Sequence, residues 1–170
     1  RGSRSDLDIA IVTSALPAAN NFTELGNALL GLGINSYTVI ALQPLTTTAD
    51  DLLAYDGVLF GLNTFFTVPT GPVGNMLADY IDAGGKLILT SPINATGYTN
   101  LPIAGRLLTD GYDPCTTGAL NGATVSTGTF DDTHPIMEGV TSYGGGLTIN
   151  CQASTDAELV ASFNTNTAFV

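Results

Sequence analysis

The sequence predicts an α/β protein with a mostly parallel sheet between two layers of helices and a β-rich C-terminal extension. Two observations support this fold class. Over residues 7–90, short apolar runs alternate four times with helical or loop segments, which is typical of right-handed β-α-β units and therefore of a parallel sheet. From residue 91 onward, loops rich in Pro, Gly, Thr and Asn separate brief apolar runs that are typical of sheet extensions.

Four runs are predicted to be strands of the parallel sheet. Residues 7–13 form an uninterrupted run rich in β-branched residues, as expected of a central strand covered on both faces. The other three strands are predicted at residues 36–42, 58–62 and 86–90. Asp56-Gly57 is the turn that leads into the third of them.

Three helices are predicted between these strands. The first spans residues 20–32, with Asn20 or Asn21 as its N-cap and Gly33 as its terminator. Its predicted apolar face consists of Phe22, Leu25, Leu29 and Leu32. Residues 48–55 form a short second helix. The third ends at Gly84-Gly85 and has apolar residues at helical spacing, namely Val73, Met76, Leu77, Tyr80 and Ile81.

The C-terminal part is predicted to contain one brief helix and three short strands. The helix is expected at residues 103–108, and the strands at residues 123–126, 147–149 and 158–163. The whole of 6–170 is expected to be a single domain, because 170 residues with 44% hydrophobic content suit one core. Residues 1–5 are expected to be a linker or cloning remnant, and the strand-like C-terminus suggests a piece of a longer protein.

Charge and hydropathy exclude several partners. Fifteen acidic residues against four basic ones give a formal net charge of -11, which disfavours nucleic acid because phosphate binding depends on Lys and Arg. No uninterrupted apolar run of membrane-spanning length and no signal peptide occur, so direct membrane insertion is not expected. No G-x-G-x-x-G or Walker pattern follows the first strand, so no nucleotide cofactor is expected either.

Two cysteines, Cys115 and Cys151, are predicted to form a disulfide. Oxidised cysteines fit an extracellular or cell-surface location, where a bridge closing this loop would stabilise the fold by roughly 3 to 4 kcal/mol. The alternative is a pair of unbonded cysteines that act as small hydrophobic residues.

Three ordered segments resemble landmarks of one family. They are Tyr55-Asp56-Gly57-Val58-Leu59-Phe60, residues 77–89 (LADYIDAGGKLIL) and His134-Pro135-Ile136-Met137-Glu138-Gly139-Val140. In order and spacing the chain resembles class I glutamine amidotransferase-like domains, and most of all the non-catalytic subgroup found in ThuA-like proteins and as accessory domains of large secreted bacterial proteins. The resemblance implies a flavodoxin-like three-layer sandwich.

The catalytic residues of that family are not apparent. Its nucleophilic cysteine stands on a glycine-flanked elbow after a strand, where backbone N–H groups meet the oxyanion. The matching segment here, residues 89–93 (LTSPI), offers Ser91 without those glycines, and Pro92 has no N–H. His134 is the sole histidine, so any histidine base must be this residue; the alternative role is a hydrogen-bonded loop residue.

Two sets of residues are candidates for binding. Loops at the carboxyl ends of parallel strands usually contact ligands, and a glycan or peptide would suit the residues Asn63, Thr64, Phe65, Phe66, Ser91 and His134. The two phenylalanines could instead pack on helices. Calcium is the candidate cation for the acidic pairs Asp110, Asp113, Asp131 and Asp132, whose alternative role is in solvated turns and caps.

These observations lead to three functional hypotheses. The preferred one is a non-catalytic accessory or interaction module that contacts other domains of a large secreted or cell-surface polypeptide. A second is a carbohydrate- or peptide-binding module that uses the strand-end loops. A third is a hydrolase with an unusual carboxylate or metal-assisted site, for which nothing specific argues.

Overall fold

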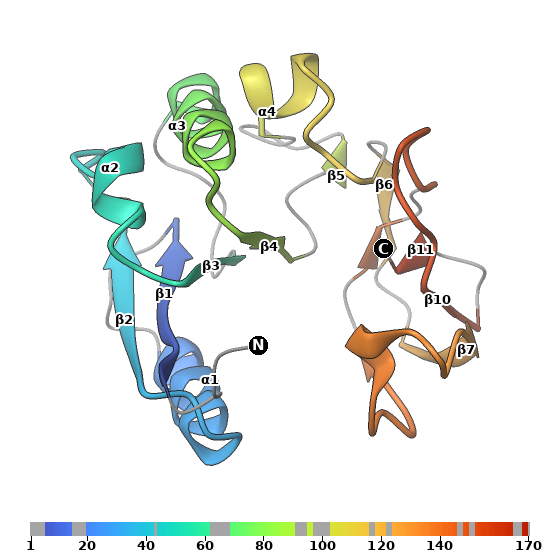
Figure 1. Cartoon of the computed structure of the whole chain (residues 1–170). Helices are drawn as coiled ribbons and strands as arrows, with labels where there is room; N and C mark the ends of the chain where they lie inside the picture. The colour runs from blue at the N-terminus through green and yellow to red at the C-terminus, as the bar shows by residue number, and fades with distance from the viewer. Residues whose placement is uncertain are drawn as a thin grey trace.

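The computed structural model describes most of the chain: residues 6–14, 20–42, 44–61, 69–90, 95–96, 103–115, 118–121, 124–145, 148–149, 152–164 and 168–169. Figure 1 shows the N-terminal half as a sheet with helices and the C-terminal part as a separate set of short strands. The two parts are joined through α4 and the strands β5 and β6.

The N-terminal sheet has four parallel strands in the order β2-β1-β3-β4. Their bounds are β1 (Asp8–Thr13), β2 (Ser36–Ala41), β3 (Gly57–Gly61) and β4 (Leu87–Leu89). This is the order of the first four strands in a flavodoxin-like sheet. The predicted fold class is therefore confirmed, and each of the four predicted strands is present with ends that differ by one residue.

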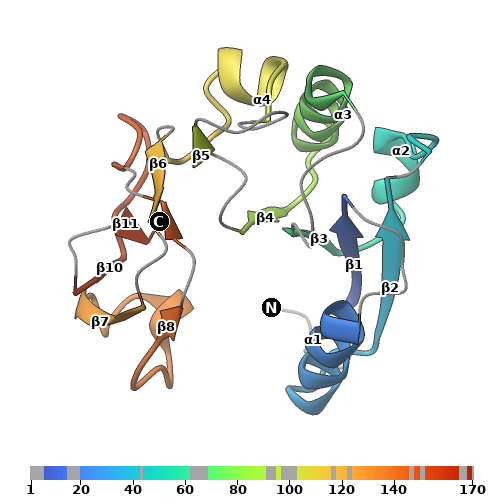
Figure 2. The same cartoon turned by 180° about the vertical axis from the view of Figure 1, so that it is seen from behind.

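Helices cover both faces of this sheet. Figures 1 and 2 show α1 (Asn20–Gly31) on one side, and α2 (Ala49–Leu52) and α3 (Thr70–Asp82) on the other. None of the helices in the described ranges is long and apolar enough to cross a membrane.

Details of α1 and α2 differ from the prediction. Asn20 and Asn21 lie inside the first turn of α1, so neither is its N-cap, and Leu32 follows the helix with 67% of its surface exposed. Gly33 has a positive φ of 95°, in keeping with its role as terminator. The second helix is a single turn rather than residues 48–55, because the chain turns at residues 53–56 to enter β3.

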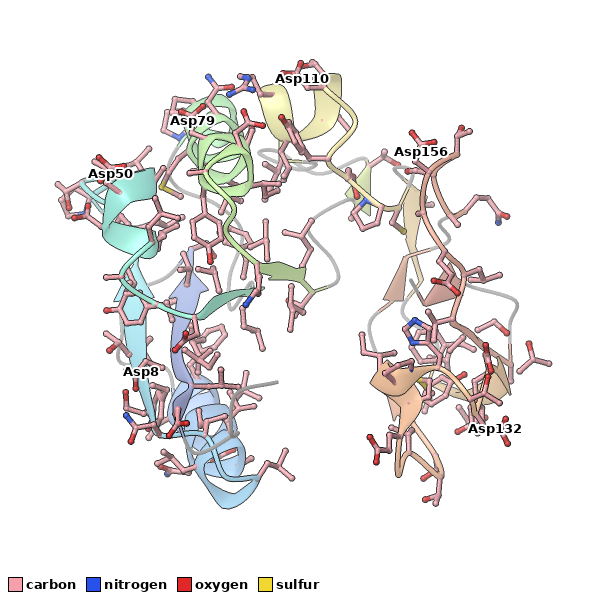
Figure 3. All side chains as sticks on the ribbon, in the orientation of Figure 1. Asp8, Asp50, Asp79, Asp110, Asp132 and Asp156 are labelled. Carbon is pink, nitrogen blue, oxygen red and sulfur yellow. The ribbon has the colours of Figure 1, made fainter. Side chains whose placement is uncertain are left out.

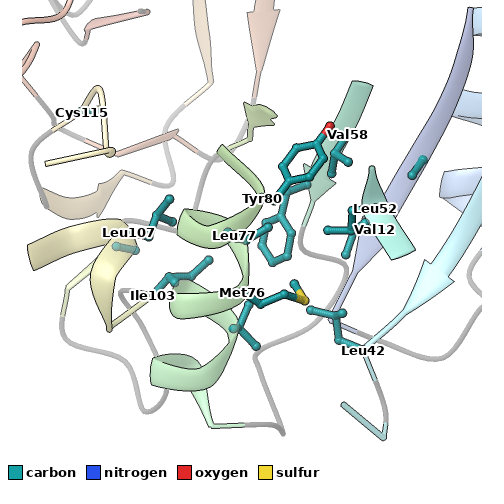
Figure 4. Packing of buried hydrophobic residues seen from close by; sticks show 14 residues of the cluster. Val12, Leu42, Leu52, Val58, Met76, Leu77, Tyr80, Ile103, Leu107 and Cys115 are labelled. Atoms are coloured by element: carbon teal, nitrogen blue, oxygen red, sulfur yellow. The ribbon is translucent and has the colours of Figure 1, made fainter. Parts of the chain in front are cut away.

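The main core lies between the sheet and α3. Side chains that alternate along the strands, such as Val12 and Val58, meet Leu77 and Tyr80 of the helix (Figure 4). The predicted apolar face of α3 is confirmed, since Val73, Met76, Leu77 and Tyr80 are buried and Ile81 is half-buried. Gly84, with a φ of 94°, ends this segment as predicted.

Tyr80 joins the core to the start of β4. Its ring is fully buried, and its hydroxyl both accepts a hydrogen bond from the Lys86 backbone N–H at 3.1 Å and donates one to the Lys86 carbonyl at 3.3 Å. Burial raises the pKa of the phenol, while the Lys86 amide opposes that rise. The side chain thus holds the chain at the turn between α3 and β4.

Tyr80→Phe is expected to lower the free energy of unfolding by about 1–2 kcal/mol. The substitution keeps the ring in the core but removes the hydroxyl that accepts the Lys86 N–H, whereas the Lys86 carbonyl still accepts the Val58 N–H at 2.8 Å. Urea unfolding measures the change, and Tyr37→Phe is the control, because the Tyr37 hydroxyl makes only long bonds of 3.3 and 3.5 Å. Equal loss in both variants would contradict this role.

Helix cover on the α1 side is uneven. Ile11, Leu59 and Ile88 occupy matching positions on β1, β3 and β4. Ile11 is fully buried, whereas Ile88 on β4 is 61% exposed. Phe22 of α1 reaches as far as Gly61 at the end of β3, since a Cβ built on that glycine would lie 3.1 Å from its ring. The edge at β4 therefore exposes aliphatic surface.

The chain then packs α4 (Arg106–Thr109) against α3. The helix predicted at residues 103–108 starts later, at Arg106, because residues 103–105 form an irregular segment that passes close to Gly74 of α3. A three-stranded sheet of order β5-β6-β9 follows, formed by β5 (Ala95–Thr96), β6 (Gly118–Asn121) and β9 (Thr148–Ile149).

The last part is an antiparallel sheet of order β11-β10-β7-β8. Its strands are β7 (Val125–Phe130), β8 (Gly144–Gly145), β10 (Ala161–Phe163) and β11 (Ala168–Phe169). The strands predicted at residues 123–126 and 158–163 were shifted or too long: residues 158–160 lie outside the ladder. A small core of Met137, Val160 and Ala161 lies beneath the aromatic rings of Phe130 and Tyr143.

Candidate functional site

The carboxyl ends of the parallel strands form the edge at which a ligand was predicted. Asn63, Thr64, Phe65, Phe66 and Ser91 all lie outside the described residues, so their roles stay predictions. Among the described residues at this edge, Thr13 at the end of β1 and Ser14 directly after it are fully buried. Thr90 after β4 donates a hydrogen bond from Oγ1 to the Phe60 carbonyl at 3.1 Å, which ties β4 to β3 at this edge.

His134 lies in the C-terminal part, at the start of the 3-10 helix η2 (Pro135–Met137). Its Nδ1 accepts a hydrogen bond from the Ile136 backbone N–H at 3.2 Å, so the ring acts as an N-cap. On the other side of the ring, Nε2 lies 3.7 Å from Glu158 Oε2. A neutral imidazole that accepts at Nδ1 carries its proton on Nε2, which points at this carboxylate.

The Asp110 carboxylate belongs to an ion-pair network that joins α3 to α4. Arg106 contacts Asp79 through Nη1, Asp82 through Nη2 at 2.7 Å and Asp110 through Nε at 2.9 Å. Tyr112 donates its hydroxyl hydrogen to Asp82, and this bond, together with Arg106, lowers the pKa of Asp82. The hydrogen bonds to Asp82 and Asp110 raise the pKa of the Arg106 guanidinium further.

Asp113 has a separate role at the buried cysteine. Its Oδ1 accepts a hydrogen bond from the Cys115 N–H at 3.0 Å, and both residues are only 8% exposed. Cys115 is disulfide-bonded and forms a β-bridge with Ala153, two residues beyond Cys151 in the chain. Cys151 is the only other cysteine, although it lies outside the described residues.

Asp131 also has local partners. Its Oδ1 accepts hydrogen bonds from the Thr133 hydroxyl at 2.6 Å and the Thr133 backbone N–H at 2.9 Å. These bonds lower the pKa of the carboxyl group. Its neighbour Asp132 is exposed. Within the described ranges, no group of three His, Cys, Asp or Glu side chains gathers as a metal ion would require, and calcium binding stays a prediction.

A hollow not foreseen from the sequence lies beside the β2–α2 connection. Its volume is about 460 Å³, and residues of the 45–49 segment face the middle of α3 across it. The residues that matter for its chemistry are Leu45, Thr46, Thr47, Asn75, Met76 and Asp79. The available signal was the three consecutive threonines, residues 46–48, in the connection that follows the second strand, because that connection starts at the carboxyl edge of the sheet.

No protein-family model, curated protein or solved structure matches the chain. The class of protein is therefore defined by the fold described above. It is an α/β protein with a four-stranded parallel sheet of order β2-β1-β3-β4, helices on both faces, and a small antiparallel C-terminal sheet.

Proposed function

We propose that this chain is a non-catalytic accessory or interaction module of a large secreted or cell-surface bacterial protein. The observation that carries the proposal is the hydrogen bonding of His134, the only histidine. A neutral imidazole has one nitrogen lone pair in the ring plane, and here that lone pair accepts the Ile136 N–H. A histidine base needs the same lone pair to remove a proton.

The carboxylates support the same proposal. Asp110 pairs with Arg106, Asp113 accepts the Cys115 N–H, and Asp131 accepts two bonds from Thr133. Each of them holds a turn or joins two elements. The pKa of Asp131 is lowered, which is the opposite of the raised pKa expected of a carboxylic acid that donates a proton near neutral pH.

The segments that resemble amidotransferase-like domains have structural roles in this chain. Residues 55–60 are a turn followed by β3, residues 77–89 join the end of α3 to β4, and residues 134–140 contain η2. These roles, together with the strand order, favour membership in the flavodoxin-like, non-catalytic group as part of our proposal. The disulfide at Cys115 and the acidic composition favour an exported protein.

A pair of His134 variants tests the non-catalytic role. His134→Ala removes the N-cap and is expected to lower the free energy of unfolding by about 1 kcal/mol. His134→Asn keeps a capping oxygen and should lose only a few tenths of a kcal/mol. Neither variant should change the rate at which the protein hydrolyses p-nitrophenyl acetate, p-nitrophenyl glycosides or glutamine. Turnover in the wild type that both variants abolish would refute the proposal.

A second candidate function is ligand binding at the carboxyl edge of the sheet. The hollow between the 45–49 segment and α3 favours it, because a polar-rimmed depression of this size at that edge suits a small ligand or a short peptide. Glycan and peptide arrays probed with the wild type and with the Phe65→Ala/Phe66→Ala variant test it. Binding by the wild type that the double variant loses would support the strand-end loops as the binding site. If the wild type bound neither array, the result would count against this second function.

A further inference from the structure

The hollow beside α3 has an apolar floor and a polar rim. Met76, which is 8% exposed, and the half-buried Leu45 form the floor. Met76 is part of the main core, and Leu45 packs against that core. Thr46 and Thr47 approach from the 45–49 segment, whereas Asn75 and Asp79 approach from α3. A ligand seated here would contact aliphatic groups below and hydrogen-bonding groups around it.

Several rim groups are not used by the fold. The Thr46 and Thr47 hydroxyls make no hydrogen bond within the described part of the chain, in contrast to Thr48, whose hydroxyl caps α2. Asn75 uses Oδ1 to accept the Arg106 backbone N–H at 2.9 Å, which leaves its NH2 group for another partner. Asp79 contacts Arg106 through Oδ1, so Oδ2 is available as an acceptor.

The charge around the hollow selects the kind of ligand. Asp79 is the charged residue of the described lining, and it belongs to the network in which Arg106 contacts Asp79, Asp82 and Asp110. One positive and three negative charges give this network, at one side of the hollow, a formal charge of -2. Figure 3 shows Asp50 of α2 on the same outer side as Asp79 and Asp110. The whole chain carries -11, so an anionic ligand is repelled at long and short range.

We propose that the hollow binds a lysine or arginine side chain of a partner polypeptide. The aliphatic stem lies on Met76 and Leu45, and the cationic head reaches Asp79 Oδ2 and the threonine hydroxyls. Lysine and arginine combine these two requirements, because their stems pack on apolar surface while their heads stay polar. A neutral saccharide would lack an aromatic ring to stack on, since none of the described residues that line the hollow is aromatic.

Amide NMR shifts of residues 45–49 and 75–79 test the proposal with three matched tripeptides. The probes are acetyl-Ala-Lys-Ala-amide and the same peptide with norleucine or glutamate in the middle. We expect saturable shifts at these amides with the lysine peptide, weaker shifts with norleucine and none with glutamate. Raising the salt concentration to about 0.5 M should weaken the lysine interaction, because exposed charges are screened.

Variants separate this site from general attraction to an acidic protein. Asp79→Asn should weaken binding of the lysine peptide by a factor of about 1.4 to 5, the range expected for an exposed ion pair. Thr47→Val, which leaves the Arg106 network intact, should weaken it less. Asp156→Asn removes an equal charge in the C-terminal part and should have no effect. Three results would overturn the proposal. They are equal amide shift changes with all three peptides, an equal loss of affinity for the lysine peptide in Asp79→Asn and Asp156→Asn, and shift changes spread over the whole surface of the protein.

The inference names a ligand for the second candidate function and therefore rests on it. A neutral probe, maltotriose, distinguishes the two. Saturable shifts at the same amides with maltotriose, and none with the lysine peptide, would overturn the basic-side-chain ligand but retain binding at this edge. Loss of array binding in Phe65→Ala/Phe66→Ala, with no peptide response at residues 45–49, would place the site in the other loop and also overturn the inference.

Discussion

Replacing Gly74 with alanine is expected to lower the free energy of unfolding by about 2–3 kcal/mol. A Cβ built at this position lies 1.7 Å from the Ala104 carbonyl oxygen and 3.1 Å from Ile103 Cγ2. The oxygen belongs to backbone, so it cannot rotate away, and the segment before α4 must move out from α3. That movement would expose Leu107 and Ile103, which are both part of the main core.

Gly71→Ala is the matched control in the same helix. A Cβ there meets nothing within 4 Å, so the higher helix propensity of alanine should leave stability unchanged or raise it by up to about 1 kcal/mol. Urea unfolding of the two variants measures the difference. If Gly74→Ala proved as stable as Gly71→Ala, the close approach of the 103–105 segment to α3 would be wrong.

Removing the disulfide is expected to lower the free energy of unfolding by roughly 3 to 4 kcal/mol, because the unfolded chain regains the freedom of the loop between the two cysteines. Cys115 is buried among core residues next to α4, and its β-bridge to Ala153 places the chain just beyond Cys151 beside it. The double variant Cys115→Ser/Cys151→Ser avoids leaving one free thiol.

Thermal unfolding with and without a reducing agent measures this effect. The wild type should lose stability when reduced, whereas the double variant should unfold at the same temperature under both conditions. Titration of the non-reduced, unfolded wild type with a thiol reagent serves as a control and should detect no free thiol. Two reactive thiols in that titration would contradict both the bridge and the expectation of an exported protein.

The parallel sheet was predictable from the sequence because local patterns specify it. An uninterrupted apolar run such as residues 9–12 (IAIV) has no polar face, so it has to be covered on both sides. The apolar spacing of α3 likewise selects one buried face, with Tyr80 at its centre. Once four strands alternate with connections, right-handed crossovers leave few possible strand orders.

The C-terminal part was harder to predict because its strands are two to six residues long and depend on distant partners. Val160 is apolar and buried, yet it lies outside the ladder and packs on Met137 instead. The strand β7 continues to Phe130 because Ala161 of β10 pairs with it there, whereas β8 pairs with the start of β7 at Val125 and Ser126. Such pairings join residues far apart in the chain, and local propensity does not encode them.

Some features of the candidate site could likewise be predicted from the sequence, whereas others depend on tertiary packing. The residue types that argue against catalysis, one histidine and no glycine-flanked cysteine, follow from composition and short motifs alone. The bond between His134 and Ile136, the three carboxylates around Arg106, and the hollow between the 45–49 segment and α3 arise from packing. Composition governs which chemistry is available, whereas contacts between remote segments govern which groups are left unpaired to meet a ligand.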